Sequence, residues 1–406
     1  MKMRYFRRLN SIQSKSIFNP ISNFSTKVKR LPLHETHIKT IPKPTMVPFA
    51  GFHMPLQYSS IKKEHFAVRN HAGLFDVSHM GEFLIEGPKS SKFVQQLLTN
   101  NTKKLQPNQA QYNLICNPSG TVIDDTILYK FSETKYMLVV NATNINKNLN
   151  HIHALQSKLF PSNQDLTITD ISEDRCLLAL QGPKSYQILD KVLNQDELSQ
   201  LPFYNFYVSD TNPLQIISRT GYTGELGYEI YLSPQKAIKM WNEILEAGQV
   251  EPAGLGARDI LRLEAGYCLY GHELSENIYP QEAGVGWAVK MKAGNFIGRD
   301  SLQAIRSSSS GFSRRLISFQ MTDRAIPREN YEIYHSPQNP IGYVTSGGFS
   351  PMVRKGIGLG LVNQNHDLNL SPGDNIKIKI RNKMEDAKIV KSPFYNNSLA
   401  KQCPII

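Results

Sequence analysis

The sequence predicts an α+β protein that ends in a separate all-β domain. Between about residues 60 and 306, helical and strand patterns follow one another without the strict alternation of a doubly wound sheet. The serine-rich run 307–311 is typical of a linker, and short strands separated by turns follow it. At 406 residues the chain is also long for a single hydrophobic core. We therefore expect two or three domains, the last of them a small β-barrel.

Apolar spacing defines the expected elements in order along the chain. Ser60 is a possible helix cap, and the helix expected at 143–159 carries apolar residues at helical spacing on one stripe. Helices are expected at 60–72, 89–99, 143–159, 234–247 and 255–268; strands are expected at about 110–116, 122–130 and 135–141; a second strand–helix–strand set is expected within 176–232. In the barrel, strands are expected at 315–319 and 375–380.

The net charge of +12 is concentrated at the N-terminus. Residues 1–34 hold eight basic residues and no acid, and removing these eight from +12 leaves +4. A basic, acid-free segment with interleaved apolar residues is typical of a mitochondrial transit peptide, and a disordered basic arm is the alternative. The remaining charge argues against a nucleic-acid-binding protein. We expect a transit peptide over residues 1–30 and a mitochondrial matrix location.

Other compositional features exclude further classes. Hydrophobic residues make up 40% and charged residues 20%, as in ordinary globular enzymes. No apolar run approaches the roughly 20 residues of a membrane helix, so no membrane is expected as a partner. The four cysteines are scattered, which argues against a disulfide framework and a cysteine-based zinc site.

A glycine-rich turn at 218–227 leads into an expected strand. The strand alternates Tyr228, Ile230 and Leu232 on one face with Glu229 and Tyr231 on the other. A carboxylate anchored on a strand can accept hydrogen bonds from a planar N–H donor such as a pterin. The local pattern also fits an ordinary hairpin with an exposed glutamate.

Two neighbouring acids, Asp124 and Asp125, lie on the strand expected at 122–130. Because neighbours on a strand face opposite sides, they do not form a carboxylate dyad. Asp125 would share its face with Ile123, Ile127 and Tyr129, where burial should raise its pKa. Such a group can act as a base or stabilise positive charge. Pairing of either acid with an arginine is the alternative.

Arg258 begins the helix expected at 255–268, after Gly254 and Gly256, which leave room for a ligand or a close backbone. Arg262 would share its face, and Asp259 can reach Arg262. A surface ladder of ion pairs is the ordinary explanation for such a cluster.

The motif Gly221-Tyr222-Thr223-Gly224-Glu225 resembles the signature of the aminomethyltransferase family, the T-protein of the glycine cleavage system. Further matches to that family follow in order at 31–37, 48–58, 73–81, 179–183, 254–259, 262–266, 344–351 and 391–394. Together they cover the chain from about residue 31 to its end. Phe52 departs from the family, which usually carries tryptophan there.

The resemblance implies a fold and an activity. The fold is a three-lobed cloverleaf in which two interleaved α+β lobes, here 31–306, and a C-terminal β-barrel, here 312–406, surround a central folate site. The activity takes the aminomethyl group on the lipoyl arm of H-protein and passes its one-carbon unit to tetrahydrofolate, releasing ammonia. Tetrahydrofolate would be the co-substrate, with no metal and no flavin, and the partners would be H-protein, P-protein and L-protein.

The resemblance also implies roles for single residues. Asp125 corresponds to the acid credited with activating the folate, and Glu229 and Arg258 would hydrogen-bond its pterin end. The remaining pocket positions would be Tyr112, Tyr222, Asn141, Met80, Leu84, Tyr129 and Trp287.

Two rival families share parts of this pattern. A folate-dependent demethylating dehydrogenase needs a flavin domain, and no G-x-G-x-x-G motif opens this chain. A folate-binding iron–sulfur assembly factor carries a Lys-Gly-Cys-Tyr-x-Gly-Gln run, which residues 265–273 lack.

Overall fold

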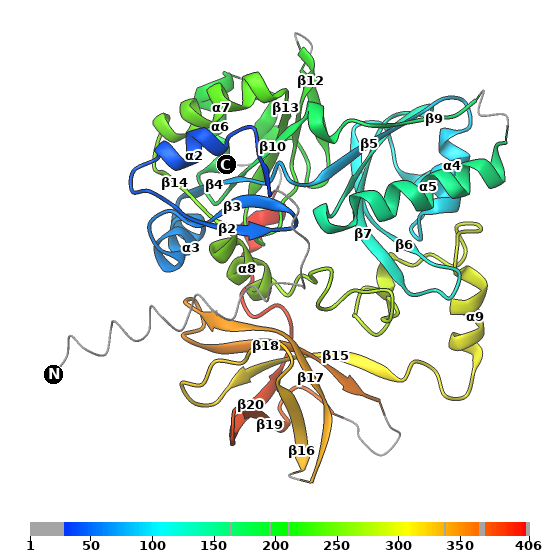
Figure 1. The fold of residues 1–406 in the computed structure, drawn as a ribbon, viewed down its shortest axis with the longest axis vertical. Coiled ribbons are helices and arrows are strands. Elements are labelled where there is room, and N and C mark those ends of the chain that lie inside the picture. The colour runs from blue at the N-terminus through cyan, green and yellow to red at the C-terminus, as the bar shows by residue number, and fades with distance from the viewer. Residues whose placement is uncertain are drawn as a thin grey trace.

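Three lobes surround a common centre in the computed structural model of the protein (Figure 1). The structure describes residues 28–161, 165–194, 196–209, 212–336, 338–364 and 370–402, so most of the expected transit peptide lies outside the described residues. We call the lobe with the six-stranded sheet lobe A, the lobe with the five-stranded sheet lobe B, and the third lobe the barrel.

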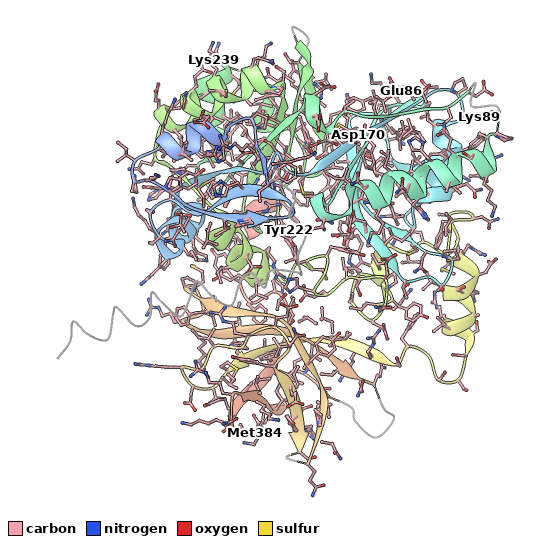
Figure 2. The ribbon with its side chains drawn as sticks, in the orientation of Figure 1. Glu86, Lys89, Asp170, Tyr222, Lys239 and Met384 are labelled. Atoms are coloured by element: carbon pink, nitrogen blue, oxygen red, sulfur yellow. The ribbon has the colours of Figure 1, made fainter. Side chains whose placement is uncertain are left out.

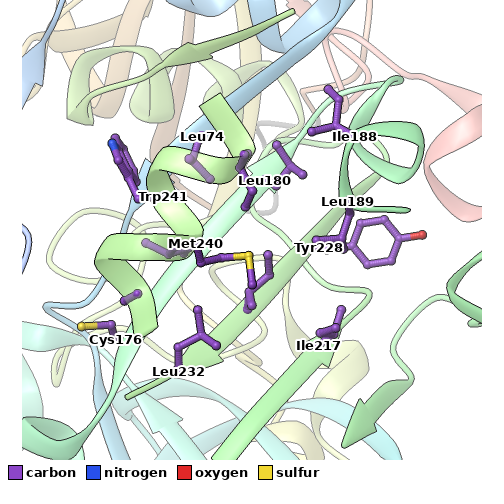
Figure 3. Packing of buried hydrophobic residues seen from close by; sticks show 14 of the residues in the cluster. Leu74, Cys176, Leu180, Ile188, Leu189, Ile217, Tyr228, Leu232, Met240 and Trp241 are labelled. Atoms are coloured by element: carbon purple, nitrogen blue, oxygen red, sulfur yellow. The ribbon is translucent and has the colours of Figure 1, made fainter. Parts of the chain in front are cut away.

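Lobe A contains a sheet of strand order β11-β12-β13-β10-β4-β14. Its elements are α2 (His34–Lys39), α3 (Ile61–Asn70), β4 (Ala72–Asp76), β10 (Cys176–Gln181), α6 (Ser185–Leu193), β11 (Phe206–Ser209), β12 (Asn212–Ser218), β13 (Gly227–Leu232), α7 (Pro234–Glu246), β14 (Val250–Pro252) and α8 (Leu255–Glu264). A small sheet of β1 (Lys29–Arg30), β3 (Phe52–Gln57) and β2 (Thr45–Phe49) lies beside it. Helices α6 and α7 cover one face of the large sheet, where Trp241 and Met240 pack on Leu180 and Leu232 (Figure 3).

Lobe B contains a sheet of strand order β6-β7-β8-β5-β9. Its elements are β5 (Gly81–Glu86), α4 (Ser90–Leu97), β6 (Gln109–Cys116), β7 (Val122–Ser132), β8 (Lys135–Val140), α5 (Ile145–Leu159) and β9 (Thr167–Asp170). Because β4 belongs to lobe A, β5–β9 to lobe B and β10 again to lobe A, the two lobes interleave in sequence. Helix α9 (Arg299–Ser307) follows before the barrel.

The barrel is closed in the order β15-β18-β17-β16-β19-β20. Its strands are β15 (Arg314–Met321), β16 (Glu332–Ser336), β17 (Asn339–Ser350), β18 (Lys355–Asn363), β19 (Asn375–Ile380) and β20 (Lys383–Val390). The predicted α+β class, the interleaved lobes and the C-terminal barrel are therefore confirmed.

The face of the lobe A sheet opposite α6 and α7 and the face of the lobe B sheet opposite α4 and α5 share a core. Tyr129 and Met137 of lobe B pack with Phe75 and Tyr231 of lobe A and with Leu261 of α8. Burying apolar surface from both lobes in one cluster fixes how their strands face each other. Residues from both sheets can therefore contribute to one site.

Three details of the sequence-based expectations are wrong. Helix α8 ends at Glu264 instead of residue 268, since Gly266 adopts a left-handed φ of +71° that stops the helix. Ile123 does not share the face of Tyr129: the β6–β7 register shifts beside it, and it packs with Leu128 in the core of lobe B. The third is an omission, since the sequence predicts no element at β1–β5, β9, β14, α2 or α9.

A buried ion network joins lobe A to the barrel. Arg69 of α3 donates to Glu264 at 2.7 Å and to Glu225 at 2.7 Å, and all three side chains are buried. Glu264 also accepts from His65 at 2.8 Å and from the barrel residue Ser350 at 2.5 Å. Although burial alone would raise it, His65 and Arg69 hold the pKa of Glu264 below its usual value.

Arg69→Met should lower the free energy of unfolding by about 3–5 kcal/mol, because two buried carboxylates lose their cation. Urea unfolding measures this loss. The control is Lys63→Met on the same helix, whose pair with Glu251 at 2.9 Å is exposed; it should cost about 1 kcal/mol or less. Equal losses in both variants would contradict a structural role for the Arg69 network.

Candidate functional site

The candidate site lies where the three lobes meet. Tyr222 is at this centre, whereas Lys239, Glu86, Lys89 and Met384 lie toward the rims (Figure 2). Strand β7 of lobe B, the turn between β12 and β13 of lobe A, and helix α8 contribute its side chains.

Asp124 is a buried structural acid. It faces helix α5 and accepts from Asn144 Nδ2 at 2.7 Å and Asn148 Nδ2 at 2.6 Å. Asn141, directly after β8, gives it two more bonds, from its backbone N–H at 3.0 Å and its Nδ2 at 2.8 Å. Four donors saturate this carboxylate. Its hydrogen bonds therefore join β7 to the end of β8 and to the start of α5.

Asp125 points to the opposite side of β7, as strand alternation predicts. It accepts from Asn141 Nδ2 at 2.8 Å and from the Tyr112 hydroxyl at 3.1 Å. Burial raises the pKa of Asp125 above its usual value, while Asn141 and Tyr112 act in the other direction. No ion pair within 4.0 Å joins either aspartate to an arginine in the described part of the chain, so the arginine alternative does not hold. Two hydrogen bonds therefore fix the position of the Asp125 carboxylate, and burial favours its protonated form.

Tyr112 links Asp125 to an exposed aromatic. Its ring stacks on Trp287 with centroids 5.4 Å apart, and Trp287 is 58% exposed. Trp287 lies in the short 3₁₀ turn Gly286–Ala288. The pair forms an aromatic wall that runs from solvent to the carboxylate.

The glycine-rich turn is built around a buried amide. Gln181 Nε2 donates to the carbonyl of Thr220 at 3.2 Å, and its Oε1 accepts from Thr223 at 3.0 Å. A Cβ on Gly221 would lie 2.0 Å from Gln181 Oε1, and one on Gly227 would lie 2.4 Å from its Cδ. These two glycines thus admit the amide that holds the turn in shape.

Glu229 follows this turn on β13, whose predicted alternation is confirmed. Tyr228 and Ile230 pack in the core under α6 and α7, whereas Tyr231 packs in the core between the lobes. Burial raises the pKa of Glu229, and its hydrogen bond from Thr220 at 2.5 Å and the nearby charge of Arg258 oppose this rise. Glu229 is not an exposed hairpin residue.

Arg258 lies across this carboxylate. Its guanidinium is 4.8 Å from the centroid of the Tyr222 ring, a cation–π arrangement. Burial lowers the pKa of Arg258, and the charge of Glu229 opposes this. In the described part of the chain, no ion pair within 4.0 Å joins Arg258 to Glu229, and Arg258 Nη1 is buried without a hydrogen-bond partner. A buried, unpaired guanidinium N–H is costly unless a ligand accepts from it.

The glycines before Arg258 serve close packing. A Cβ on Gly254 would lie 2.4 Å from the carbonyl oxygen of Leu56, and one on Gly256 would lie 2.5 Å from Ile61 Cδ1. Arg262 pairs with Asp259 at 2.8 Å as expected, but it is buried and also binds Glu273 at 3.1 Å. The cluster is not a surface ladder.

The remaining predicted residues lie around this centre. The Tyr222 hydroxyl donates to the carbonyl of Cys268, and its ring stacks on Tyr267 with centroids 5.8 Å apart. Met80 packs against the core between the lobes, which contains Tyr129. Leu84 of β5 pairs with Met137 of β8, which pairs in turn with Tyr129 of β7.

Two residues near Glu229, Thr220 and Tyr231, are not among the site residues that the sequence predicts. Thr220 contacts Glu229, and the Tyr231 hydroxyl donates to that of Tyr129 at 3.0 Å. Thr220 lies inside the glycine-rich motif, which was the available signal. Tyr231 appeared only as a residue on the face of Glu229.

Comparisons with known proteins identify the family of this chain. The model of the GCVT N-terminal domain matches residues 33–293, and that of the glycine cleavage T-protein C-terminal barrel domain matches 314–396. The chain belongs to the glycine cleavage T-protein family. The predicted family and enzyme class, aminomethyltransferase, are thereby confirmed.

Individual relatives of this T-protein family cover nearly the whole chain. An aminomethyltransferase from Halothermothrix orenii is 45% identical over 90% of this chain and 100% of its own length. One from Thermosipho melanesiensis is 44% identical over 92% of this chain and 98% of its own length. The crystal structure of glycine cleavage system aminomethyltransferase T from Bartonella henselae superposes with a TM-score of 0.83 at 32% identity, covering 91% of this chain and 98% of that one.

Gly227→Ala should lower the free energy of unfolding by about 1–3 kcal/mol, because the new methyl group must displace the Gln181 amide. Urea unfolding measures the loss. Gly248→Ala is the control, since its Cβ would meet only Ile188 at 3.4 Å. A loss no larger than that of the control would show that Gln181 does not shape the turn.

Proposed function

We propose that this chain transfers the one-carbon unit of the aminomethyl group on the lipoyl arm of H-protein to tetrahydrofolate, giving 5,10-methylenetetrahydrofolate and ammonia. The observation that carries the proposal is Arg258, whose buried Nη1 has no partner in the described structure and whose guanidinium lies over Tyr222 near Glu229. Family membership fixes the reaction class to which this arrangement belongs.

The residues present fit the pterin end of a reduced folate. Such a ring system offers planar N–H donors for Glu229 and ring acceptors for Arg258. The Tyr222 ring packs against the Arg258 guanidinium and would hold it beside the ligand. Tyr112, Tyr129, Trp287, Met80 and Leu84 would form the walls, and Asn141 would hold Asp125. The reduced folate supplies the nucleophilic nitrogen that accepts the one-carbon unit.

Asp125 would serve the chemical step. Its carboxylate is held by the Tyr112 hydroxyl and by Asn141, whose Nδ2 also donates to Asp124. A half-buried carboxylate there can stabilise the positive charge that develops on the transferred carbon as ammonia leaves. It can also accept a proton, since its pKa is raised by burial.

The partners and the location are part of the same proposal. The lipoylated H-protein would bring the aminomethyl group, and P-protein and L-protein would act on H-protein in the other steps of glycine cleavage. The acid-free basic segment before the family match supports a transit peptide over residues 1–30 and a mitochondrial matrix location; the relatives compared above are bacterial. No nucleic-acid partner is proposed.

The described residues contain neither a membrane-spanning helix nor a cluster of metal ligands. No described helix is long and apolar enough to cross a membrane. The side chains in that part of the chain also form no group of three or more potential metal ligands.

The decisive experiment is ammonia release from aminomethylated H-protein. The protein should release ammonia rapidly with tetrahydrofolate present and slowly without it, and methylenetetrahydrofolate should form in equal amount. Release that does not depend on tetrahydrofolate would contradict the proposal.

Arg258→Ala and Glu229→Ala should each weaken tetrahydrofolate binding by about 1–3 kcal/mol, because each leaves a buried ligand group unpaired. Anaerobic calorimetry measures the affinity. Lys239→Ala, on the rim of lobe A, is the control and should bind as the unaltered protein does. Unchanged affinity in both site variants would remove these residues from the pocket.

Asp125→Asn should lower single-turnover transfer by about a hundredfold or more, with folate affinity changed much less. Asp124→Asn is the matched control: it should lower the thermal midpoint, because it disturbs four hydrogen bonds, and retain transfer. In the unaltered protein, transfer should fall with decreasing pH at a value above the ordinary aspartate pKa of about 3.9, since burial raises the pKa of Asp125 and the charged form is the active one. Loss of transfer only in a well-folded Asp124→Asn protein would reverse the assignment.

A protein that lacks residues 1–27 should fold and transfer the one-carbon unit at the full rate, because residues 1–24 lack the sequence pattern of a packed element and the family match begins at residue 33. Thermal midpoint and ammonia release test this. A truncated protein that fails to fold would contradict the transit-peptide proposal.

A further inference from the structure

A chain of buried hydroxyl groups crosses from the core between the lobes to Glu229. The Tyr231 hydroxyl donates to the Tyr129 hydroxyl at 3.0 Å. Tyr129 lies 3.3 Å from Thr220 Oγ1, and Thr220 donates to Glu229 Oε2 at 2.5 Å. The three hydroxyl-bearing residues are buried, with exposures of 4% or less.

The chain has one direction. Each hydroxyl has a single proton, so Tyr129, which accepts from Tyr231, can give its own proton to Thr220 or to Ser218, which also hydrogen-bonds it. Thr220 Oγ1 also lies 2.9 Å from Ser218 Oγ. A carboxylate accepts more strongly than a neutral hydroxyl, so the proton of Thr220 goes to Glu229. Successive donors polarise one another, which strengthens the last bond.

This arrangement leaves Glu229 with one oxygen for a ligand. Oε2 is occupied by Thr220, and in the described structure no donor reaches Oε1. The bond also restrains rotation of the carboxylate, which leaves Oε1 as the oxygen that a flat ligand can approach. Because Tyr129 comes from β7 of lobe B and the other members from β12–β13 of lobe A, the orientation of Glu229 depends on how the lobes pack.

We propose that Thr220 is a positioning residue for the reduced folate, which it orients through Glu229, and that Tyr129 and Tyr231 reinforce it. This inference rests on the proposed binding of folate by Glu229. It goes beyond that proposal because the orientation of the folate would be set by hydroxyl groups that need not contact the folate.

The electrostatic surroundings of Glu229 give the chain a measurable signature. Titratable groups near Glu229 are Arg258 of α8, Tyr129 of β7, Tyr204 before β11 and Tyr231 of β13. Burial raises the pKa of Glu229, and the Thr220 hydroxyl opposes that rise. Loss of the hydroxyl should therefore raise the pKa further, so that folate affinity begins to fall at a higher pH.

The test compares Thr220→Val, which keeps the shape, with Thr220→Ser, which keeps the hydroxyl. Anaerobic calorimetry with tetrahydrofolate is run across pH 5–9, with thermal midpoints recorded. Thr220→Val should bind tetrahydrofolate about tenfold more weakly at neutral pH. The pH below which its folate affinity falls should also be higher than in the unaltered protein. Thr220→Ser should bind within about twofold of the unaltered protein. Transfer at saturating folate should change less than affinity in every variant.

Tyr231→Phe provides a second approach if Thr220→Val folds poorly. It should weaken binding by about two- to threefold, whereas Tyr228→Phe on the same strand should not, since that hydroxyl donates to the Leu198 carbonyl instead. If Glu229→Ala weakens binding but Thr220→Val keeps the affinity and pH dependence of the unaltered protein, the hydroxyl chain is overturned and the folate site stands. If Glu229→Ala has no effect, both proposals fail.

Discussion

The structure depends on the buried cation of Arg69. This side chain donates to Glu264 of α8, to Glu225 and to the carbonyl of Thr223 in the glycine-rich turn. Its Cζ also lies 4.5 Å from the ring centroid of Tyr395 in the C-terminal segment. The same α8 carries Arg258, and the same turn carries Tyr222. A desolvated ion pair tolerates little change in geometry, because each displaced partner becomes an unpaired buried charge. The two halves of the candidate pocket are thus held at a fixed separation.

Around this framework the protein keeps unusual charges at its centre. Asp124, Asp125, Glu229 and Arg258 are all disfavoured in their charged forms by burial. Asp124 is compensated by four donors from its own lobe, which leaves nothing for a ligand. Asp125 and Glu229 are held by fewer donors, and Arg258 keeps an unpaired N–H. Incomplete satisfaction separates the residues prepared for a ligand from those that only stabilise the fold.

The candidate site also depends on the packing of both lobes. The cluster around Tyr129, Phe75 and Tyr231 draws its side chains from both sheets and from helices α3 and α8. Asp125 comes from one side of this joint and Glu229 from the other. A change in lobe packing would therefore alter the distance between the acid of the chemical step and the group proposed to hold the folate.

The sequence by itself determined the α+β class, the C-terminal barrel, the family and the opposite orientations of Asp124 and Asp125. These follow from local periodicity and motif order, which need no knowledge of distant contacts. Only the tertiary structure decided that Gly221 and Gly227 admit Gln181, that Ile123 leaves the face of Asp125 at a register shift, and that Thr220 binds Glu229. Each of these depends on side chains far apart in the chain or on strand pairing, which the local pattern does not specify. The physical reason is that burial and partnership, unlike periodicity, are properties of the whole packed molecule.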